Sequence, residues 1–309
     1  MALNLDAVGT VLGPAEFEYN EDDVILYAIG VGVEPDELEF VYENMLKVLP
    51  TFAVIPARGP ALNTAKLVEI DYTKLLHGEN RIEVYKPLPP HAKFTATATV
   101  KAIYDKGKGA VVVTELEAKD ELGELLFKNI SSAFVRGEGG WGGDRGPSGP
   151  KNVPPDREPD AVVSMTTRKD QAHLYRLCGD KNLLHIDPEF AKSSGFEEPI
   201  LHGLCTYGHV GRAVLKTYCD NEPTKMKAFE VRFSGVVYPG DTITTEMWKV
   251  ADDKIVLRAK TDDDNIVISG AAAELNAVGD PKCCYTCIRY KYVRCRKLYC
   301  CDCAPPTKT

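Results

Sequence analysis

The residues best suited to chemistry are an acid, an amide and an imidazole that share one short segment. Asp180, Asn182 and His185 fall within six residues, directly after Gly179. A carboxylate and an imidazole this close together can hold one water molecule and exchange protons with it. Gly203 follows where a helix is expected to begin, and a helix start presents free N–H groups and its positive dipole end. The pattern therefore predicts acid–base chemistry beside an oxyanion-binding helix start.

Two predicted helices position these groups. Proline at 188 and glycine at 195 suit the start and the end of a short helix. A second, longer helix is predicted from Leu204, because apolar or small residues recur at helical spacing. These residues are Leu204, Tyr207, Gly208, Gly211, Val214, Leu215 and Tyr218. His202, just before the long helix, is compatible with a structural role or with an indirect role in the site.

The motif resembles a known family signature. The run Tyr-x-Leu-x-Gly-Asp-x-Asn-x-x-His from Tyr175, followed by Leu-His-Gly-Leu-Cys-Thr, is similar to that of the (R)-specific 2-enoyl-CoA hydratases. These type 2 hydratases are MaoC-like hot-dog proteins, and they include stand-alone plant enzymes and the hydratase domain of peroxisomal type 2 multifunctional enzymes. The resemblance covers about residues 1–278. It implies a hydro-lyase of fatty-acid β-oxidation that reversibly converts trans-2-enoyl-CoA to (3R)-3-hydroxyacyl-CoA, without a metal or another cofactor.

The resemblance also implies roles for individual residues. Asp180 and His185 would hold the water and move its protons, Asn182 would help to fix it, and the backbone N–H of Gly203 would bind the thioester oxygen. The implied acyl-CoA contacts are His77, Gly78, Lys106, Tyr175, Asp180, Lys181, Asn182, Leu183, Leu184, His185, Gly203 and Phe233. The family usually has proline where this chain has Leu183. Proline stiffens a loop, so we expect Leu183 to reduce the preorganisation of the site.

A faint internal repeat suggests two copies of one fold. The apolar run 24–33 aligns with the motif, so that Tyr27 matches Tyr175 and Gly32 matches Asp180. The first copy has no carboxylate or imidazole at the catalytic positions. The expected fold is therefore α+β, a double hot-dog with two central helices, each wrapped by a curled antiparallel sheet. The family implies that the two sheets join edge to edge.

The predicted organisation has four parts. Residues 1–140 form a degenerate, acyl-binding hot-dog, residues 141–158 a Gly/Pro-rich linker, residues 159–278 the catalytic hot-dog, and residues 279–309 a cysteine-rich tail. In the first part, a helix is predicted over 35–50, a broken central helix over 51–67, and a loop at His77-Gly78. Strands are predicted at 81–85, 94–100, 110–118, 125–135, 161–166, 228–233, 242–250, 254–260 and 266–275.

Composition limits the remaining function classes. The 309 residues carry a formal net charge of −8, which argues against a general nucleic-acid binder. No apolar run reaches the ~18 residues of a membrane helix, and the N-terminus lacks the features of a secretory signal. The family implies an acyl-CoA substrate, a homodimer and a peroxisomal location. The chain ends in Lys-Thr rather than a Ser-Lys-Leu type of signal, and the other expected location is the cytoplasm.

Cysteines are concentrated in the tail. Seven of the ten lie in residues 283–303, including Cys284-x-x-Cys287 and Cys300-x-x-Cys303, which are separated by twelve residues. This spacing is close to that of a zinc site, although no glycines follow the pairs. Three interpretations stay open for the tail: a disordered extension, a zinc site and redox pairing.

Two other functions are compatible with these features. One is a hot-dog thioesterase, and the other is a non-catalytic acyl-CoA-binding module. A thioesterase would release a free thiol, whereas a binding module would bind substrate without consuming the enoyl group.

Overall fold

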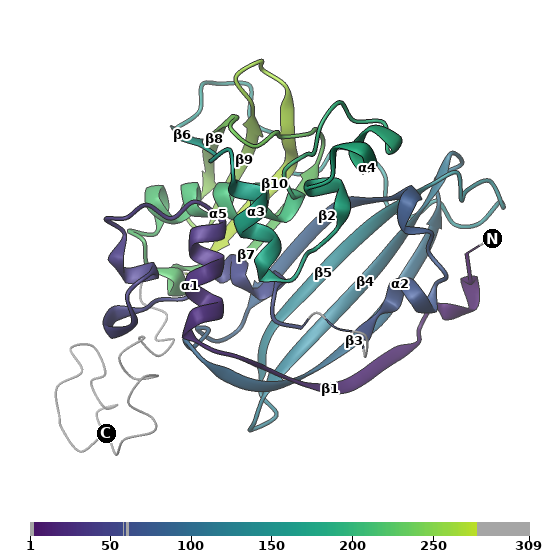
Figure 1. The fold of residues 1–309 in the computed structure, drawn as a ribbon, viewed down its shortest axis with the longest axis horizontal. Helices are drawn as coiled ribbons and strands as arrows, with labels where there is room; N and C mark the ends of the chain where they lie inside the picture. Colours follow the sequence, from purple (N-terminus) through teal and green to yellow (C-terminus); the bar gives the residue numbers. More distant parts are fainter. Residues whose placement is uncertain (1–2, 58, 60–61, 277–309) are drawn as a thin grey trace.

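The computed structural model describes residues 3–57, 59 and 62–276, and in it the strands form one continuous antiparallel sheet (Figure 1). The strand order is β1-β3-β4-β5-β2-β7-β10-β9-β8-β6. The strands are β1 Val11–Tyr19, β2 Leu75–Val84, β3 Ala92–Asp105, β4 Gly109–Asp120, β5 Leu125–Arg136, β6 Ala161–Thr166, β7 Met226–Phe233, β8 Thr242–Ala251, β9 Lys254–Lys260 and β10 Ile266–Leu275. All the strands predicted from the sequence are present. β1 was not predicted.

The α-helices of the described residues are α1 Glu21–Gly30, α2 Thr64–Leu67, α3 Gln171–Tyr175, α4 Pro188–Ser193 and α5 Gly203–Tyr218. The predicted long helix is α5, and the predicted short helix is α4. Short 3₁₀ turns fill several loops, among them η2 Leu38–Phe40, η3 Glu43–Met45, η4 Pro50–Val54 and η8 Leu183–His185. None of the described helices is long and apolar enough to cross a membrane.

The two halves of the sheet join through β2 and β7, as expected. These strands are antiparallel, with Arg81 opposite Glu230 and Ile82 opposite Phe229. Arg81 also forms an ion pair with Glu230, with 3.7 Å between the guanidinium and carboxylate atoms. The junction therefore covers one open edge of each half with the other, and the predicted α+β double hot-dog is confirmed.

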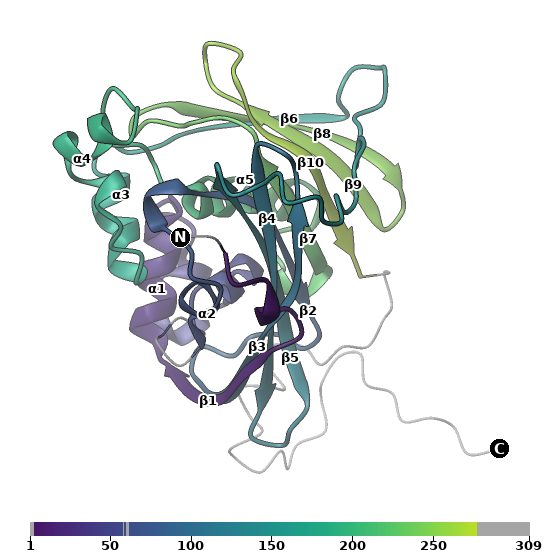
Figure 2. The ribbon, with the colours of Figure 1, turned by 90° about the vertical axis from the view of Figure 1, so that its right-hand side faces the viewer.

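Helix α5 occupies the inner side of the sheet and packs against β7, β8 and η4 (Figures 1 and 2). Every residue from Leu204 to Leu215 is buried. Two glycines bring its backbone close to its neighbours, since a Cβ at Gly208 would lie 2.3 Å from Val31 Cγ1 and one at Gly211 2.6 Å from Thr51 Cγ2. The helix is therefore the centre of the main hydrophobic core.

The internal repeat is visible in three dimensions. β1 leads into α1 and β6 leads into α3, and the two helices contact each other, with 6.2 Å between the ring centroids of Tyr27 and Tyr175. A Cβ at Gly32, which aligns with Asp180, would lie 2.6 Å from His209 Nε2. A side chain at Gly32, the position that aligns with Asp180, would therefore require the buried His209 ring to move.

The N-terminal half differs from the sequence prediction in two places. The helix predicted over 35–50 is wrong, because the described backbone before Pro50 forms only the short turns η2 and η3. The broken central helix predicted over 51–67 is confirmed as two separate short elements, η4 and α2, with Pro56 and Gly59 between them. His77 and Gly78 lie within β2, at a register shift of the β2–β5 pair, rather than in a loop.

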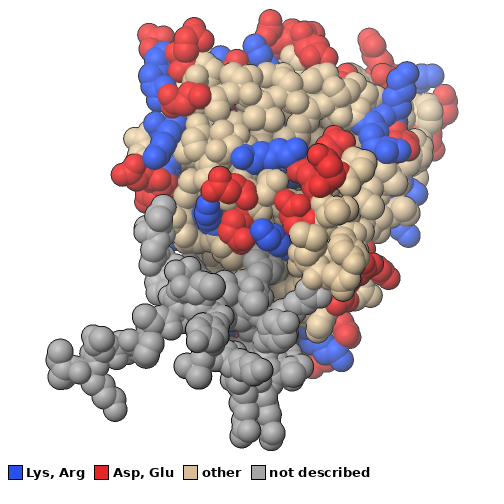
Figure 3. Space-filling view, turned by 90° about the vertical axis from the view of Figure 1, so that its left-hand side faces the viewer, with Lys and Arg blue, Asp and Glu red and all other residues tan. Residues whose placement is uncertain are grey.

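The surface carries charges of both signs. On the face in Figure 3, acidic and basic side chains alternate around an uncharged area. The described part of this face therefore offers no continuous basic surface for a polyanion. The cysteine-rich tail, residues 279–309, lies outside the described residues.

Candidate active site

The loop between α3 and α4 holds the predicted acid and base. Gly179 ends the preceding turn with a left-handed backbone, φ 112°, which glycine adopts without strain. The Asp180 carboxylate accepts a hydrogen bond from the backbone N–H of Asn182, and the Asn182 side-chain oxygen accepts one from Leu184 N–H at 3.1 Å. Asn182 thus caps η8 and shapes the loop; its predicted contact with the catalytic water stays a prediction.

His185 is oriented as a proton acceptor. Its Nδ1 lies 2.8 Å from the carbonyl oxygen of Ile200. Because a carbonyl only accepts, Nδ1 carries the proton, and Nε2 of the neutral ring has the lone pair. Burial lowers the pKa of His185, against the opposing effects of the Ile200 hydrogen bond and the Asp180 charge. The imidazole is therefore neutral at pH 7 and can accept a proton from water.

His202 supports both groups. Its side chain is buried, and Nε2 lies 3.1 Å from the backbone oxygen of Asp180. The ring stacks on His185 with 3.7 Å between centroids and 30° between planes, and it lies 4.9 Å from the ring of Tyr175. His202 therefore ties the loop to the start of α5, which favours an indirect, positioning role for it. Its place directly before Gly203 was the one sequence signal for this role.

The start of α5 brings three other predicted residues together. A Cβ at Gly203 would lie 3.2 Å from Phe233 Cδ1, so the Phe233 ring packs directly on this glycine. The Phe233 ring lies 4.7 Å from the ring of His77. A Cβ at Gly78 would lie 3.1 Å from Ser132 Oγ. Gly203 therefore lies between the Asp180–His185 loop and an aromatic pair from β2 and β7.

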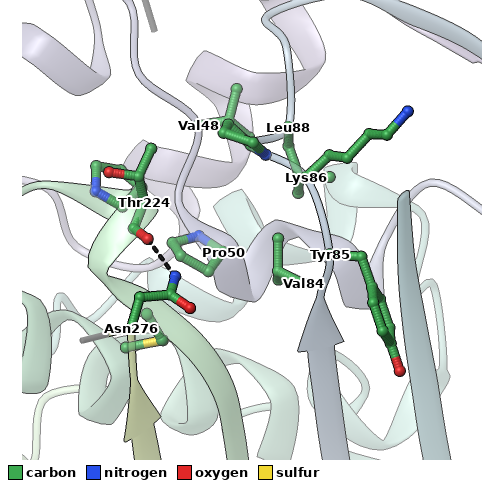
Figure 4. A pocket seen from close by; sticks show the side chains of 11 residues that line it. Val48, Pro50, Val84, Tyr85, Lys86, Leu88, Thr224 and Asn276 are labelled. Carbon is green, nitrogen blue, oxygen red and sulfur yellow. Dashed lines mark hydrogen bonds between the residues drawn. The ribbon is translucent and has the colours of Figure 1, made fainter. Parts of the chain in front are cut away.

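A cavity of about 190 Å³ lies between β2–β5 and the segment that contains η4. His77 and Leu204 line it, so it reaches the aromatic pair and the residue after Gly203. The sequence prediction that the N-terminal half provides an acyl tunnel agrees with this position. A smaller hollow between η4 and Asn276 (Figure 4) has only about 10 Å³, room for roughly one water molecule.

Three predicted contact residues lie on the periphery. Lys106 is on the β3–β4 turn, where its ammonium donates to the carbonyl oxygens of Arg145 and of Pro147, the latter at 2.9 Å. Both of these hydrogen-bond acceptors belong to the linker. Lys181 and Leu183 are exposed, and the adjacent Leu184 is partly buried.

The ligand atoms of Asp180, His185 and His202 all lie within 4.8 Å of one another. This spacing could hold a metal ion, and it also suits a water molecule between a carboxylate and an imidazole. Nδ1 of His185 already donates to a carbonyl oxygen, which leaves Nε2 of this ring for either ligand. Hydration of a conjugated double bond requires an acid, a base and an oxyanion donor, so the same atoms suffice without a metal.

The chain was compared with known proteins. Residues 17–137 match the MFE-2 hydratase 2 N-terminal domain, and residues 151–270 match the MaoC like domain. A probable enoyl-CoA hydratase 2 of Dictyostelium discoideum is 43% identical over 275 residues, covering 86% of this chain and 94% of the relative. The peroxisomal enoyl-CoA hydratase 2 of Arabidopsis thaliana is 41% identical over 259 residues, covering 77% of this chain and 84% of the relative.

The fold of this chain is also similar to that of a solved structure. The MaoC-like dehydratase from Phytophthora capsici has a TM-score of 0.77 at 32% identity, and the match covers 88% of this chain and 98% of that one. The resemblance inferred from the motif around Asp180 is thereby confirmed. This chain belongs to the MaoC-like hydratase 2 family, with an N-terminal hydratase 2 domain followed by a MaoC-like domain.

Proposed function

We propose that this protein is a hydro-lyase that reversibly hydrates trans-2-enoyl-CoA to (3R)-3-hydroxyacyl-CoA in fatty-acid β-oxidation. One observation carries the proposal. The side-chain ligand atoms of Asp180 and His185 lie within 4.8 Å of each other, in a loop that His202 ties to the start of α5. The names of the relatives, enoyl-CoA hydratase 2, support the same activity.

The reaction follows from this geometry. A water molecule between the Asp180 carboxylate and Nε2 of His185 gives up a proton as its oxygen attacks C3 of the enoyl group. Negative charge moves to the thioester oxygen, where the N–H of Gly203 and the dipole of α5 stabilise the enolate. The pair then returns a proton to C2. General acid–base catalysis contributes roughly 10²–10⁴-fold, and one oxyanion donor contributes roughly 10²–10³-fold.

The same proposal assigns the substrate contacts. The acyl chain enters the cavity beside His77 and Leu204 and continues among residues of the N-terminal part, 1–140. Lys106 faces the CoA phosphates, where a cation is favourable. The remaining proposed contacts are Gly78, Tyr175, Lys181, Asn182, Leu183, Leu184 and Phe233. The catalytic part is residues 159–278, and residues 141–158 connect the two.

We infer a homodimer and a peroxisomal location by analogy with the family. The name of the Arabidopsis relative supports the location. Sedimentation of the purified protein tests the oligomeric state. Fluorescence microscopy of the chain with its C-terminus left free tests the location.

The direct test follows the loss of enoyl absorbance with trans-2-enoyl-CoA. Asp180→Asn and His185→Gln keep the size of each side chain but remove the acid or the base. We expect each change to lower turnover by at least ~10²-fold while substrate binding is largely kept. Normal rates in both variants would exclude the mechanism.

A thiol reagent and a binding measurement separate the rival functions. A hot-dog thioesterase would release free CoA thiol from the substrate, whereas a hydratase leaves the thioester intact. An acyl-CoA-binding module would bind the enoyl-CoA without any loss of its absorbance. The proposed function requires consumption of the enoyl group with no release of thiol.

A further inference from the structure

The lining of the proposed acyl cavity is partly apolar and partly polar. The apolar residues include Val54 in η4, and Ala98 on β3 and Leu116 on β4, which face the cavity from the sheet. The polar residues also belong to the sheet and form the polar wall: Asn80 on β2, Thr114 on β4, and Asn129 and Ser131 on β5. A tunnel for a purely hydrocarbon chain would be expected to be apolar on all sides. The polar wall therefore requires an explanation.

Strand pairing aligns these polar residues. Asn80 is directly opposite Ser131, and Ser131 is directly opposite Thr114, so the three residues form one row across three adjacent strands. Asn129, two residues before Ser131, lies in the next row on the same face of the sheet. The polar groups are therefore a continuous patch rather than isolated side chains.

Two side-chain oxygens of this patch lack a partner. Asn80 is 1% exposed, and its amide lies near the Tyr207 hydroxyl. The Oδ1 atoms of Asn80 and Asn129 have no hydrogen-bond partner among the described residues. Thr114 has one, since its hydroxyl lies 3.3 Å from the hydroxyl of Thr64. Buried acceptors without donors are unfavourable, and a hydrocarbon chain in the cavity would leave them so.

We propose that the acyl chain preferred by this protein carries a hydroxyl group in its middle part, which binds to the polar patch of Asn80, Thr114, Asn129 and Ser131. This inference rests on the proposed function for the identity of the CoA thioester. A hydroxyl fits because it can donate to one of the two asparagine oxygens and accept from Ser131. The apolar residues beside the patch, among them Val54, Ala98 and Leu116, accommodate the methylene groups.

The position of the hydroxyl follows from the strand. Asn80 is three residues beyond His77 on β2, but the register shift at Gly78 leaves their partners, Ala133 and Ser131, only two residues apart on β5, which is roughly 7 Å at about 3.3 Å per residue. His77 is adjacent to Phe233 and so to the proposed thioester site. A hydroxyl close to the thioester would not reach the patch, whereas one in the middle of a medium-length chain would.

Binding of saturated acyl-CoAs tests the inference without any need for turnover. Isothermal titration calorimetry with the full chain would compare dodecanoyl-CoA with dodecanoyl-CoAs that carry one hydroxyl at successive mid-chain positions. The variants are Asn129→Leu, of similar size but apolar, and Asn265→Leu, a matched control on the exposed β9–β10 turn. Hydration of unsubstituted dodecenoyl-CoA is measured in parallel.

We expect one hydroxylated chain to bind wild type and Asn265→Leu about tenfold more tightly than the plain chain. Asn129→Leu should abolish or reverse this preference. Ser131→Ala is the second variant if Asn129→Leu does not fold, and it should reduce the preference. If wild type bound dodecanoyl-CoA as tightly as, or more tightly than, every hydroxylated form, the inference would be overturned. Water would then be the ligand of the polar patch. Normal hydration of dodecenoyl-CoA in the same experiment would leave the proposed function intact. Absence of binding by every acyl-CoA would overturn both this inference and the proposed function.

Discussion

Replacing Gly203 with alanine should remove activity without removing stability. The new Cβ would lie 3.2 Å from Phe233 Cδ1 and 3.3 Å from Cε1, so the ring must move by a few tenths of an ångström from a normal contact of about 3.5–4 Å. Alanine is up to about 1 kcal/mol better than glycine in a helix interior and gains less at Gly203, the first residue of α5, so it offsets part of this strain. We therefore expect the free energy of unfolding to change by no more than about 1 kcal/mol.

Activity should respond far more strongly. The methyl group would stand where the thioester oxygen must approach the N–H, and a misplacement of about 1 Å can lower a rate by roughly 10²-fold. Loss of an oxyanion donor has an effect of similar size. We expect kcat/KM for trans-2-enoyl-CoA to fall about 10²-fold, measured together with urea unfolding of the same preparation.

Gly208→Ala, on the same helix, is the matched control. Its Cβ would lie 2.3 Å from Val31 Cγ1 and 2.8 Å from Val31 Cβ, which overpacks the core and should lower stability by about 1–3 kcal/mol. Its turnover per folded molecule should stay near normal. Full activity of folded Gly203→Ala would refute the role of Gly203 as oxyanion donor. If Gly203→Ala lost as much stability as Gly208→Ala, its loss of activity would have a structural cause.

Three further predictions concern ionisable groups. Because burial lowers the pKa of His185, the acid limb of the kcat/KM profile should lie below pH 6.5 with a plateau at neutral pH, and an acid limb above pH 7 would contradict a buried neutral base. Burial lowers the pKa of His209 from its ordinary value of about 6.5 to about 4. As the pH falls, His209 therefore binds a proton in the unfolded chain before it does so in the folded protein. The free energy of unfolding should decrease by about 3 kcal/mol between pH 6.5 and 4. Urea unfolding at several pH values should show a smaller decrease in His209→Gln, and an unchanged slope would exclude His209 as the cause. Arg212, 2% exposed, is ion-paired with Glu37. Arg212→Met should lower the free energy of unfolding by about 3 kcal/mol, because it leaves the buried Glu37 with only the partly exposed Lys216 ammonium, at 3.1 Å, and adding Glu37→Gln should recover part of the loss. If Arg212→Met and the double variant with Glu37→Gln were equally stable, the charge of Glu37 would not be the source of the loss.

Several local features were predictable because they depend on neighbouring residues alone. Asp180 and His185 are five positions apart, and the cap formed by Asn182 and the turn at Gly179 keep them on one loop. The long helix from Gly203 followed from apolar periodicity, which reports a buried helix face. The alternation in 94–100 likewise predicted a strand that the structure contains within β3.

The failed helix over 35–50 shows the limit of periodicity. Of the apolar residues predicted for one helix face, Phe40 and Val48 are buried, whereas Leu38 and Met45 are each 49% exposed, and the backbone forms short turns and irregular structure. Periodicity therefore identified only some of the buried side chains and missed the path of the backbone. The reason is that tertiary contacts override local propensity where each apolar residue finds its own site in the core.

The sequence alone determined which residues could do chemistry, the family signature that they form and their place within one short segment after Gly179. Only the tertiary structure decided what surrounds them. His77 on β2 and Phe233 on β7 are far apart in the sequence, and they meet at Gly203 because the β2–β7 pair joins the two halves. The polar wall of Asn80, Ser131 and Thr114 is likewise created by strand register. Register depends on long-range hydrogen bonds and burial, which no short segment contains.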